Sequence, residues 1–265
     1  MPTHDNYLTF LGTGTSVGVP VIGCSCPVCK SDDPRNNRTR SSITVDSGSI
    51  RILVDSGPDL REQALREGIS SIDAIIYTHG HVDHVAGFDE LRAFCWGKEK
   101  PLPLFATDSC LAMLKSMFPW AFHTDNIHRG YVKPDPRPLV DGIKIGEISV
   151  TPLPVAHGSV ETVGLLFAIP NGFRFAYLPD VKTIPQSTMK MLTGLDLLII
   201  DTLRDGPHST HLSLPEALAI SEKLSPTKTL LTHMSHDLDH ASLAASLPSG
   251  VSPAYDGLRV PLEFS

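Results

Sequence analysis

One short segment of the chain concentrates side chains that can bind metal ions. The segment YTHGHVDHVAG follows an apolar run and contains His79, His81, Asp83 and His84 within six positions. Histidine and aspartate are poor material for a strand or a core. The segment is therefore either a polar surface turn or a site for positive charge, and imidazole and carboxylate ligands suit zinc, manganese or iron.

Further candidate ligands lie far away in the sequence. His157, Asp180, Asp201 and His233 each lie at or near the end of a predicted strand. Strand ends along one sheet edge can converge from remote positions, which is how metal sites are assembled on rigid scaffolds. This pattern favours a metal site over the simpler interpretation of the segment, a polar helix N-terminus with Asp83 near a cap position.

A second cluster consists of thiols. Cys24, Cys26 and Cys29 supply three sulfur ligands within six residues, one short of a tetrahedral structural zinc site. In a reducing compartment this spacing favours metal binding over a disulfide framework. The alternatives are a reduced, metal-free loop and a local disulfide.

The fourth ligand of the thiol cluster has to come from elsewhere. Cys95 and Cys110 are candidates, but both lie in apolar, helix-like surroundings that are typical of core cysteines. His236 lies three residues beyond the candidate ligand His233. It could therefore tie the cysteine loop to the rim of the other site.

Apolar patterning predicts the elements that position these residues. The expected strands are Leu8–Leu11, Ser42–Asp46, Ile50–Asp55, Ala74–Thr78, Leu102–Thr107, Ile143–Pro152, Gly164–Ile169, Phe173–Leu178, Leu195–Asp201 and Thr229–His233. The expected helices are Asp59–Glu67, Phe88–Ala93, Ser109–Met117, Pro215–Leu224 and Ala241–Leu247.

The order of these elements predicts an α/β protein. We expect two mixed sheets with helices on the outer faces, a four-layer αββα sandwich, over a single domain 1–265. A zinc-stapled loop is expected at about 22–40, and a proline-rich surface loop at about 120–141.

Composition limits the possible partners. The net charge is −7 and no block of lysine or arginine occurs, which argues against an extended nucleic-acid surface. A small anionic substrate remains compatible, because bound metal ions supply positive charge. No run approaches the ~18 apolar residues of a membrane span, and the N-terminus lacks a secretory signal pattern. We expect a cytoplasmic location without membrane association.

The segment from Thr78 to His84 resembles the HxHxDH signature of metallo-β-lactamase-fold hydrolases, and the resemblance covers nearly the whole chain from Phe10 onward. It implies the αββα sandwich and a dinuclear centre. One metal would be held by His79, His81 and His157, the other by Asp83, His84 and His233, with Asp180 bridging.

Two further similarities refine this expectation. Asp55 resembles the strand-end aspartate of that family, which orients a ligating histidine; an ordinary turn residue before Gly57 is the alternative. The thiol cluster makes the chain similar to the phosphoribosyl 1,2-cyclic phosphate phosphodiesterases of the phosphonate pathway. These carry a separate zinc site of three cysteines and a histidine, which implies His236 as the fourth ligand.

His211 resembles the general-acid histidine of phosphodiesterases in this superfamily. Its task would be to protonate the leaving alkoxide, for which histidine is suited near neutral pH. Arg204 and His208 precede it and could contact a substrate phosphate. Alternatively, Arg204 is a solvated surface residue and His208 is a loop residue without a role in the site.

We therefore expect a phosphodiesterase that opens small, cyclic phosphodiesters to phosphomonoesters. Hydroxide generated between two divalent ions (manganese or zinc, with iron also compatible) would attack phosphorus, and His211, Asp83 and Asp180 would carry catalysis. A separate structural zinc would stabilise the fold, and homodimers are one state that the resemblance implies. The alternatives are a thioester hydrolase of the glyoxalase II type, a tRNA 3′-processing nuclease and a non-enzymatic zinc-stabilised binding module.

Overall fold

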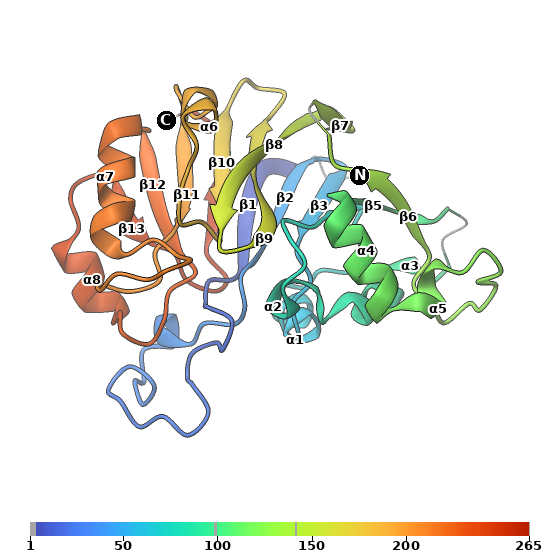
Figure 1. The fold of residues 1–265 in the computed structure, drawn as a ribbon, viewed down its shortest axis with the longest axis horizontal. Coiled ribbons are helices and arrows are strands. Elements are labelled where there is room, and N and C mark those ends of the chain that lie inside the picture. The colour runs from blue at the N-terminus through green and yellow to red at the C-terminus, as the bar shows by residue number, and fades with distance from the viewer. Residues whose placement is uncertain (1–3, 98–99, 141, 265) are drawn as a thin grey trace.

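The computed structural model describes residues 4–97, 100–140 and 142–264, and two seven-stranded sheets face each other at its centre (Figure 1). The first sheet has the order β14-β1-β2-β3-β4-β5-β6 and the second β13-β12-β11-β10-β9-β8-β7. Each sheet contains parallel and antiparallel pairs. The predicted pair of mixed sheets is therefore confirmed.

The strands run as follows. The first sheet consists of β1 His4–Gly12, β2 Ser42–Gly48, β3 Ile50–Val54, β4 Ala74–Ile76, β5 Leu102–Ala106, β6 Pro134–Pro138 and β14 Arg259–Pro261. The second consists of β7 Ile143–Ile145, β8 Ile148–His157, β9 Val160–Ala168, β10 Arg174–Leu178, β11 Leu197–Asp201, β12 Lys228–Thr232 and β13 Val251–Pro253.

Helices cover the outer face of each sheet (Figure 1). Beside the first sheet lie α1 Leu60–Arg66, α2 Val82–Val85, the 3-10 turn Phe88–Leu91, α3 Arg92–Cys95, α4 Asp108–Met117 and α5 Pro119–Phe122. Beside the second lie α6 Gln186–Met191, α7 Leu214–Leu224 and α8 His240–Ser246. None of the described helices is long and apolar enough to cross a bilayer.

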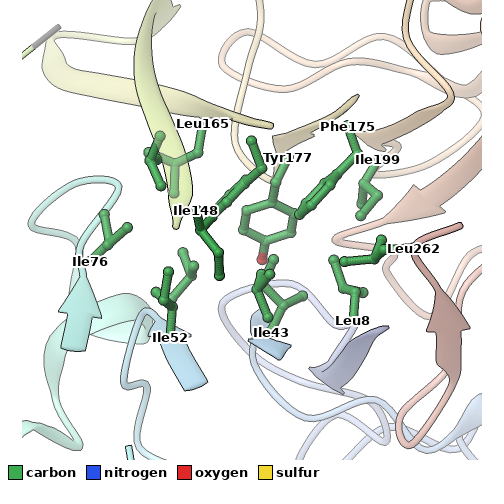
Figure 2. Packing of buried hydrophobic residues seen from close by; sticks show 14 of the residues in the cluster. Leu8, Ile43, Ile52, Ile76, Ile148, Leu165, Phe175, Tyr177, Ile199 and Leu262 are labelled. Carbon is green, nitrogen blue, oxygen red and sulfur yellow. The ribbon is translucent and has the colours of Figure 1, made fainter. Parts of the chain in front are cut away.

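The central strands are apolar throughout because both of their faces are buried. Ile199 of β11 points into the core between the sheets, whereas Leu198 and Ile200 pack under the outer helices. In β3, Ile52 points into the core between the sheets and Leu53 packs under the outer helices. Figure 2 shows the middle core, where side chains of the two sheets meet. Three apolar layers therefore separate four layers of secondary structure.

The proline-rich stretch at 120–141 was expected to be a loop, and part of it is a strand instead. Residues 134–138 form β6, which pairs in parallel with β5 at the edge of the first sheet. Lys133 O accepts from Leu102 N at 2.7 Å and Leu139 N donates to Ala106 O at 2.9 Å. Residues 133, 135, 137 and 139 thus face β5, and the three prolines between them face outward, where no N–H is needed. Asp141 lies outside the described residues.

Another predicted strand, Ile143–Pro152, is two strands. Gly146 turns the chain with φ +58° and separates β7 from β8, which pair antiparallel. The expected strands Gly164–Ile169 and Phe173–Leu178 form a hairpin: β9 and β10 pair antiparallel around Asn171 and Gly172, and Gly172 has φ +92°. The start of α7 is also as expected, with a capping box between Ser213 and Glu216.

Candidate metal centre

The candidate ligands of the dinuclear centre meet at one end of the two sheets. His79 and His81 lie in the turn between β4 and α2, and Asp83 and His84 lie in α2 itself. The second sheet contributes His157 at the end of β8, Asp180 after β10 and His233 after β12. Strand ends from both sheets thus bring together residues that are up to 154 positions apart, from His79 to His233 (233 − 79 = 154).

His79, His81 and His157 form a first group. His81 Nδ1 lies 2.9 Å from His79 Nε2 and 3.3 Å from His157 Nε2. Ligand nitrogens at 2.0–2.1 Å from a tetrahedral zinc ion are about 3.4 Å apart. The three nitrogens therefore have the spacing of ligands to one ion.

In two of these rings, His157 and His79, a hydrogen bond at Nδ1 leaves Nε2 free to bind a metal ion. His157 Nδ1 donates to the Thr210 carbonyl at 2.8 Å, so Nε2 of the neutral ring carries the lone pair. Thr78 Oγ1 donates to Asp55 Oδ2 at 2.9 Å and accepts from His79 Nδ1 at 3.0 Å. The free nitrogens of both rings consequently face the centre of the group.

His84, Asp83, Asp180 and His233 form a second group. His84 Nε2 lies 3.0 Å from Asp180 Oδ2 and 3.3 Å from Asp83 Oδ2. Asp180 Oδ1 lies 3.5 Å from His233 Nε2 and 3.7 Å from His157 Nε2 of the first group. The Asp180 carboxylate is therefore the group that touches both ligand sets.

Asp55 supports both groups from behind. Its Oδ2 accepts from His84 Nδ1 at 2.8 Å and from Thr78 Oγ1, and its Oδ1 accepts from the Thr78 backbone N–H at 2.8 Å. The residue is completely buried and has φ +62°, a left-handed conformation that costs energy for any residue other than glycine. The structure places Asp55 where the sequence predicted it, and also links it to His79 through Thr78.

His233 is held in a comparable way. Ser41 Oγ donates to the Gly14 carbonyl at 3.0 Å and accepts from His233 Nδ1 at 3.1 Å, which leaves His233 Nε2 free. His233 also has a left-handed backbone, with φ +57°. Ser41 and Gly14 carried no sequence signal for this role, because serine and glycine are ordinary loop residues.

Two observations indicate that this donor set fits divalent ions. His84 Nε2 and Asp180 Oδ2 are buried 3.0 Å from each other, but neither makes a well-aligned hydrogen bond among the described residues, and a cation would satisfy both atoms. Burial lowers the pKa of His79 well below its usual range and lowers the pKa of His233 to about 4. The His79 and His233 imidazoles are therefore neutral near pH 7, the form that binds metal. At His84 the opposing effect of burial is outweighed by the carboxylates of Asp180, Asp55 and Asp83, which raise its pKa well above the usual range.

The thiol cluster is complete and includes the predicted histidine. His236 Nδ1 lies 3.3, 3.7 and 3.4 Å from the sulfur atoms of Cys24, Cys26 and Cys29. Sulfur and nitrogen ligands of a tetrahedral zinc ion are about 3.6 Å apart. Cys29 N donates to Cys26 Sγ at 3.4 Å, and this backbone hydrogen bond lowers the pKa of Cys26 to about 7.

The other two cysteines lie away from this cluster. Cys110, a residue of α4, is buried in the core that this helix covers, and Cys95 packs against the same core. Cys24, Cys26, Cys29 and Cys110 form no disulfide with any residue that the structure describes. The long loop that carries the thiol cluster extends from the body of the molecule between β1 and β2 (Figure 1).

His211 stands beside the two ligand groups. Its Nδ1 donates to Asp201 Oδ2 at 2.8 Å, and Asp201 is completely buried. The opposite nitrogen, Nε2, is therefore the one available to the pocket that His211 lines. Asp201 was recognised in the sequence as a strand end, but its partnership with His211 had no sequence signal.

Arg204 and His208 do not line the pocket. The Arg204 guanidinium donates to the carbonyls of Gly206 and Pro207 and so braces its own loop. The His208 ring lies 5.2 Å from that of His211, and its Nδ1 accepts from the Thr210 N–H. A contact of Arg204 or His208 with a substrate phosphate stays a prediction.

The ligand groups open onto a solvent-accessible pocket of about 440 Å³. Residues that the sequence did not single out complete its wall: Ser16, Val82, Gly158, Ser159, Val160 and Thr210. A volume of this size suits a small molecule. The arrangement thus combines two groups of metal-binding atoms, one additional imidazole and room for a compact substrate.

Comparisons with known proteins agree with this architecture. The family described as "Beta-lactamase superfamily domain" matches residues 50–234. A coenzyme PQQ synthesis protein B of Methylorubrum populi is 31% identical over 221 residues, which cover 74% of this chain and 72% of the relative.

An octanoyltransferase of Porphyromonas gingivalis is 35% identical over 259 residues. The match covers 94% of this chain but 50% of the relative, so the chain spans half the length of that protein. Among solved structures, a crystal structure of a new diphosphatase from the PhnP family is 41% identical, with a TM-score of 0.89 and 97% of both chains covered.

Proposed function

Because the chain belongs to the metallo-β-lactamase superfamily of metal-dependent hydrolases, we propose that it is a phosphodiesterase that opens small cyclic phosphodiesters to phosphomonoesters. The observation that carries the proposal is the His211–Asp201 pair beside the ligand groups. A phosphodiester has a poor alkoxide leaving group, and a positioned imidazole is the group that protonates it.

In this proposal the two ligand groups hold two divalent ions. The ligands would be His79, His81 and His157 for one ion and Asp83, His84 and His233 for the other, with Asp180 between them. Bound there, the ions would supply a hydroxide nucleophile near neutral pH and positive charge for the phosphoryl oxygens. Manganese, zinc and iron all suit such ligands.

The chain's own residues orient the metal-binding rings and protonate the leaving group. Thr78, Asp55 and Ser41 fix the ring orientations of His79, His84 and His233, so that little reorganisation is needed during the reaction. His211 Nε2 delivers a proton to the departing oxygen, and the buried Asp201 carboxylate stabilises the imidazolium form. A separate zinc ion in the Cys24–His236 cluster would stabilise the fold and take no part in the reaction.

A second candidate is hydrolysis of a diphosphate. It is favoured by one observation, the 41% identity to a diphosphatase of the PhnP family. The two reactions share the attacking group and the metal ions, but they differ in the leaving group. A departing phosphate is a much weaker base than an alkoxide, so it depends less on an acid such as His211.

A hydrolysis panel on the metal-reconstituted protein tests the proposal. The panel contains a phosphoribosyl 1,2-cyclic phosphate, a 2′,3′-cyclic nucleotide, a linear dinucleotide, a nucleoside diphosphate and an acyl thioester. We expect the highest kcat/KM on a cyclic phosphate, with Asp180→Ala protein as the blank for contaminating hydrolases. The highest value on the nucleoside diphosphate would establish the second candidate, and the highest value on the thioester would contradict both.

A further inference from the structure

Arg38 is an arginine that is 1% exposed and forms no ion pair with any described carboxylate. Its guanidinium donates to the carbonyls of Ser235 and Leu238, at 2.7 and 2.6 Å, and to Asn36 Oδ1 at 3.1 Å. Burial lowers the pKa of Arg38 to about 10. The carboxylates of Asp256, Asp239 and Asp33 act on the Arg38 charge only at a distance. A buried guanidinium without a directly paired carboxylate is costly to remove from water, so its hydrogen bonds should stabilise a specific arrangement of the chain.

The two carbonyls flank one turn that carries ligands of both metal sites. His233, at the start of the turn, belongs to the dinuclear centre, and His236 completes the thiol cluster. Ser235 and Leu238 lie on either side of His236 in the sequence. The Arg38 side chain is therefore hydrogen bonded to the 233–238 turn, the segment of chain that connects the two sites.

The backbone of Arg38 holds the other half of the thiol cluster. Val19 N donates to Arg38 O at 2.8 Å and Arg38 N donates to Val19 O at 2.7 Å. This pair closes the base of the loop that carries Cys24, Cys26 and Cys29. Ser41, three residues further on, accepts from His233 Nδ1. All four ligands of the thiol cluster thus lie on two segments that Arg38 joins.

The turn needs such support because its first residue is strained. His233 has φ +57°, which a non-glycine residue adopts only when its surroundings enforce it. Met234 N donates to Thr13 O and Ser235 N donates to Leu203 O, both at 2.9 Å. A metal ion on His236 restrains the same turn from its other end, so it should favour the conformation that His233 requires.

We propose that Arg38 is a positioning residue that couples the two metal sites energetically. Filling the thiol cluster raises the affinity of the dinuclear centre for its ions, and Arg38 transmits the effect by fixing the 233–238 turn against the cysteine loop. The inference rests on the proposed metal sites. Thermodynamic linkage requires the reverse effect to have the same size, and such couplings are typically about 5–150-fold.

Equilibrium metal titrations test the coupling. Co²⁺ bound at the cysteines is followed by its thiolate charge-transfer absorption, and Mn²⁺ at the dinuclear centre by electron paramagnetic resonance. In the wild-type protein each metal should tighten the other by on the order of tenfold. In Arg38→Lys, which keeps the charge but cannot span two carbonyls, that factor should fall toward one while Co²⁺ still binds. Arg35→Ala should keep the wild-type factor, because Arg35 lies in the same loop but its ion pair is with Asp33 on the surface.

Several outcomes would overturn the inference. Independent binding of the two metals in the wild-type protein would do so, even if Arg38→Lys failed to fold. An unchanged coupling factor in folded Arg38→Lys would also do so. Failure of Mn²⁺ to bind would refute the dinuclear centre instead. In that case amide hydrogen exchange of Met234 and Ser235 tests the role of Arg38. Co²⁺ should slow this exchange in the wild-type protein and slow it much less in Arg38→Lys. Equal slowing in both proteins would overturn the role of Arg38.

Discussion

Asp201 Oδ2 lies 2.8 Å from His211 Nδ1, and the same oxygen accepts the backbone N–H of Val181 at 3.0 Å. The carboxyl group is completely buried, so its orientation is fixed by the fold. The imidazole it supports is consequently aimed at the pocket through one nitrogen, Nε2. This geometry makes Asp201 a positioning residue for the proposed proton transfer.

Asp201→Asn should lower turnover without emptying the metal sites. The amide keeps the shape of the side chain but supplies no negative charge to stabilise the His211 imidazolium. We expect kcat on a cyclic phosphodiester to fall by ~10²-fold at nearly constant KM. Steady-state kinetics together with elemental analysis check this. A variant with normal kcat would show that Asp201 serves only to anchor Val181.

His211→Ala tests the acid itself. The metal content should stay nearly intact, and turnover on substrates with an alkoxide leaving group should fall by ~10²–10⁴-fold. The loss should be much smaller on a nitrophenyl phosphodiester, because the phenolate departs without a proton. Kinetics on matched alkyl and aryl diesters separate the roles: equal losses on both would refute the acid assignment, and a change confined to KM would indicate phosphate binding.

Asp180→Ala removes the carboxylate that touches both ligand groups. We expect activity to disappear and the metal bound at the dinuclear centre to decrease, while zinc at the cysteines is retained. Elemental analysis of the wild-type and variant proteins, before and after treatment with a chelator, measures the metal content of the dinuclear centre and of the thiol cluster. Full metal content with normal turnover would remove Asp180 from the centre.

Cys26→Ser should release about one zinc ion per chain and lower the melting temperature, because structural zinc binding contributes folding free energy. Cys95→Ser is the matched control, since Cys95 lies outside the thiol cluster and should leave the zinc content unchanged. Zinc analysis and thermal unfolding of both variants give the comparison. Wild-type protein that holds no metal beyond the dinuclear pair would contradict the assignment.

Tyr177 offers a test of the core. Its ring is completely buried between the sheets near Leu165 and Phe175 (Figure 2), and its hydroxyl has no partner among the described residues. Tyr177→Phe should leave the free energy of unfolding unchanged or raise it by about 1 kcal/mol. Tyr77→Phe is the control, because Tyr77 shares a 2.5 Å hydrogen bond with Ser56 and should lose about 1 kcal/mol. Urea unfolding measures both, and a clear destabilisation of Tyr177→Phe would mean that its hydroxyl is hydrogen bonded in solution.

Part of the ligand groups could be predicted from the sequence because His79, His157, Asp180 and His233 each lie at or just after the end of an apolar run that forms a strand. His157 and Asp180 illustrate this. Strands β8 and β10 lie on either side of β9 and are both antiparallel to it, so their C-terminal ends lie at the same edge of the sheet. Arg38 and Ser41 could not be predicted, because their roles depend on long-range contacts with residues near 235 that no local pattern encodes. Strand β6 was missed for a different reason: proline lowers strand propensity in every window, and only the pairing with β5 reveals that the prolines face outward.

The three outward prolines of β6 also bear on how copies of this chain can associate. A strand from another molecule needs N–H groups on the exposed edge to form a continuous ladder, and residues 134, 136 and 138 have none to offer. The β6 edge is therefore protected against polymerisation by strand addition. Any assembly that extends the first sheet across a molecular boundary has to begin at the opposite margin, beside β14.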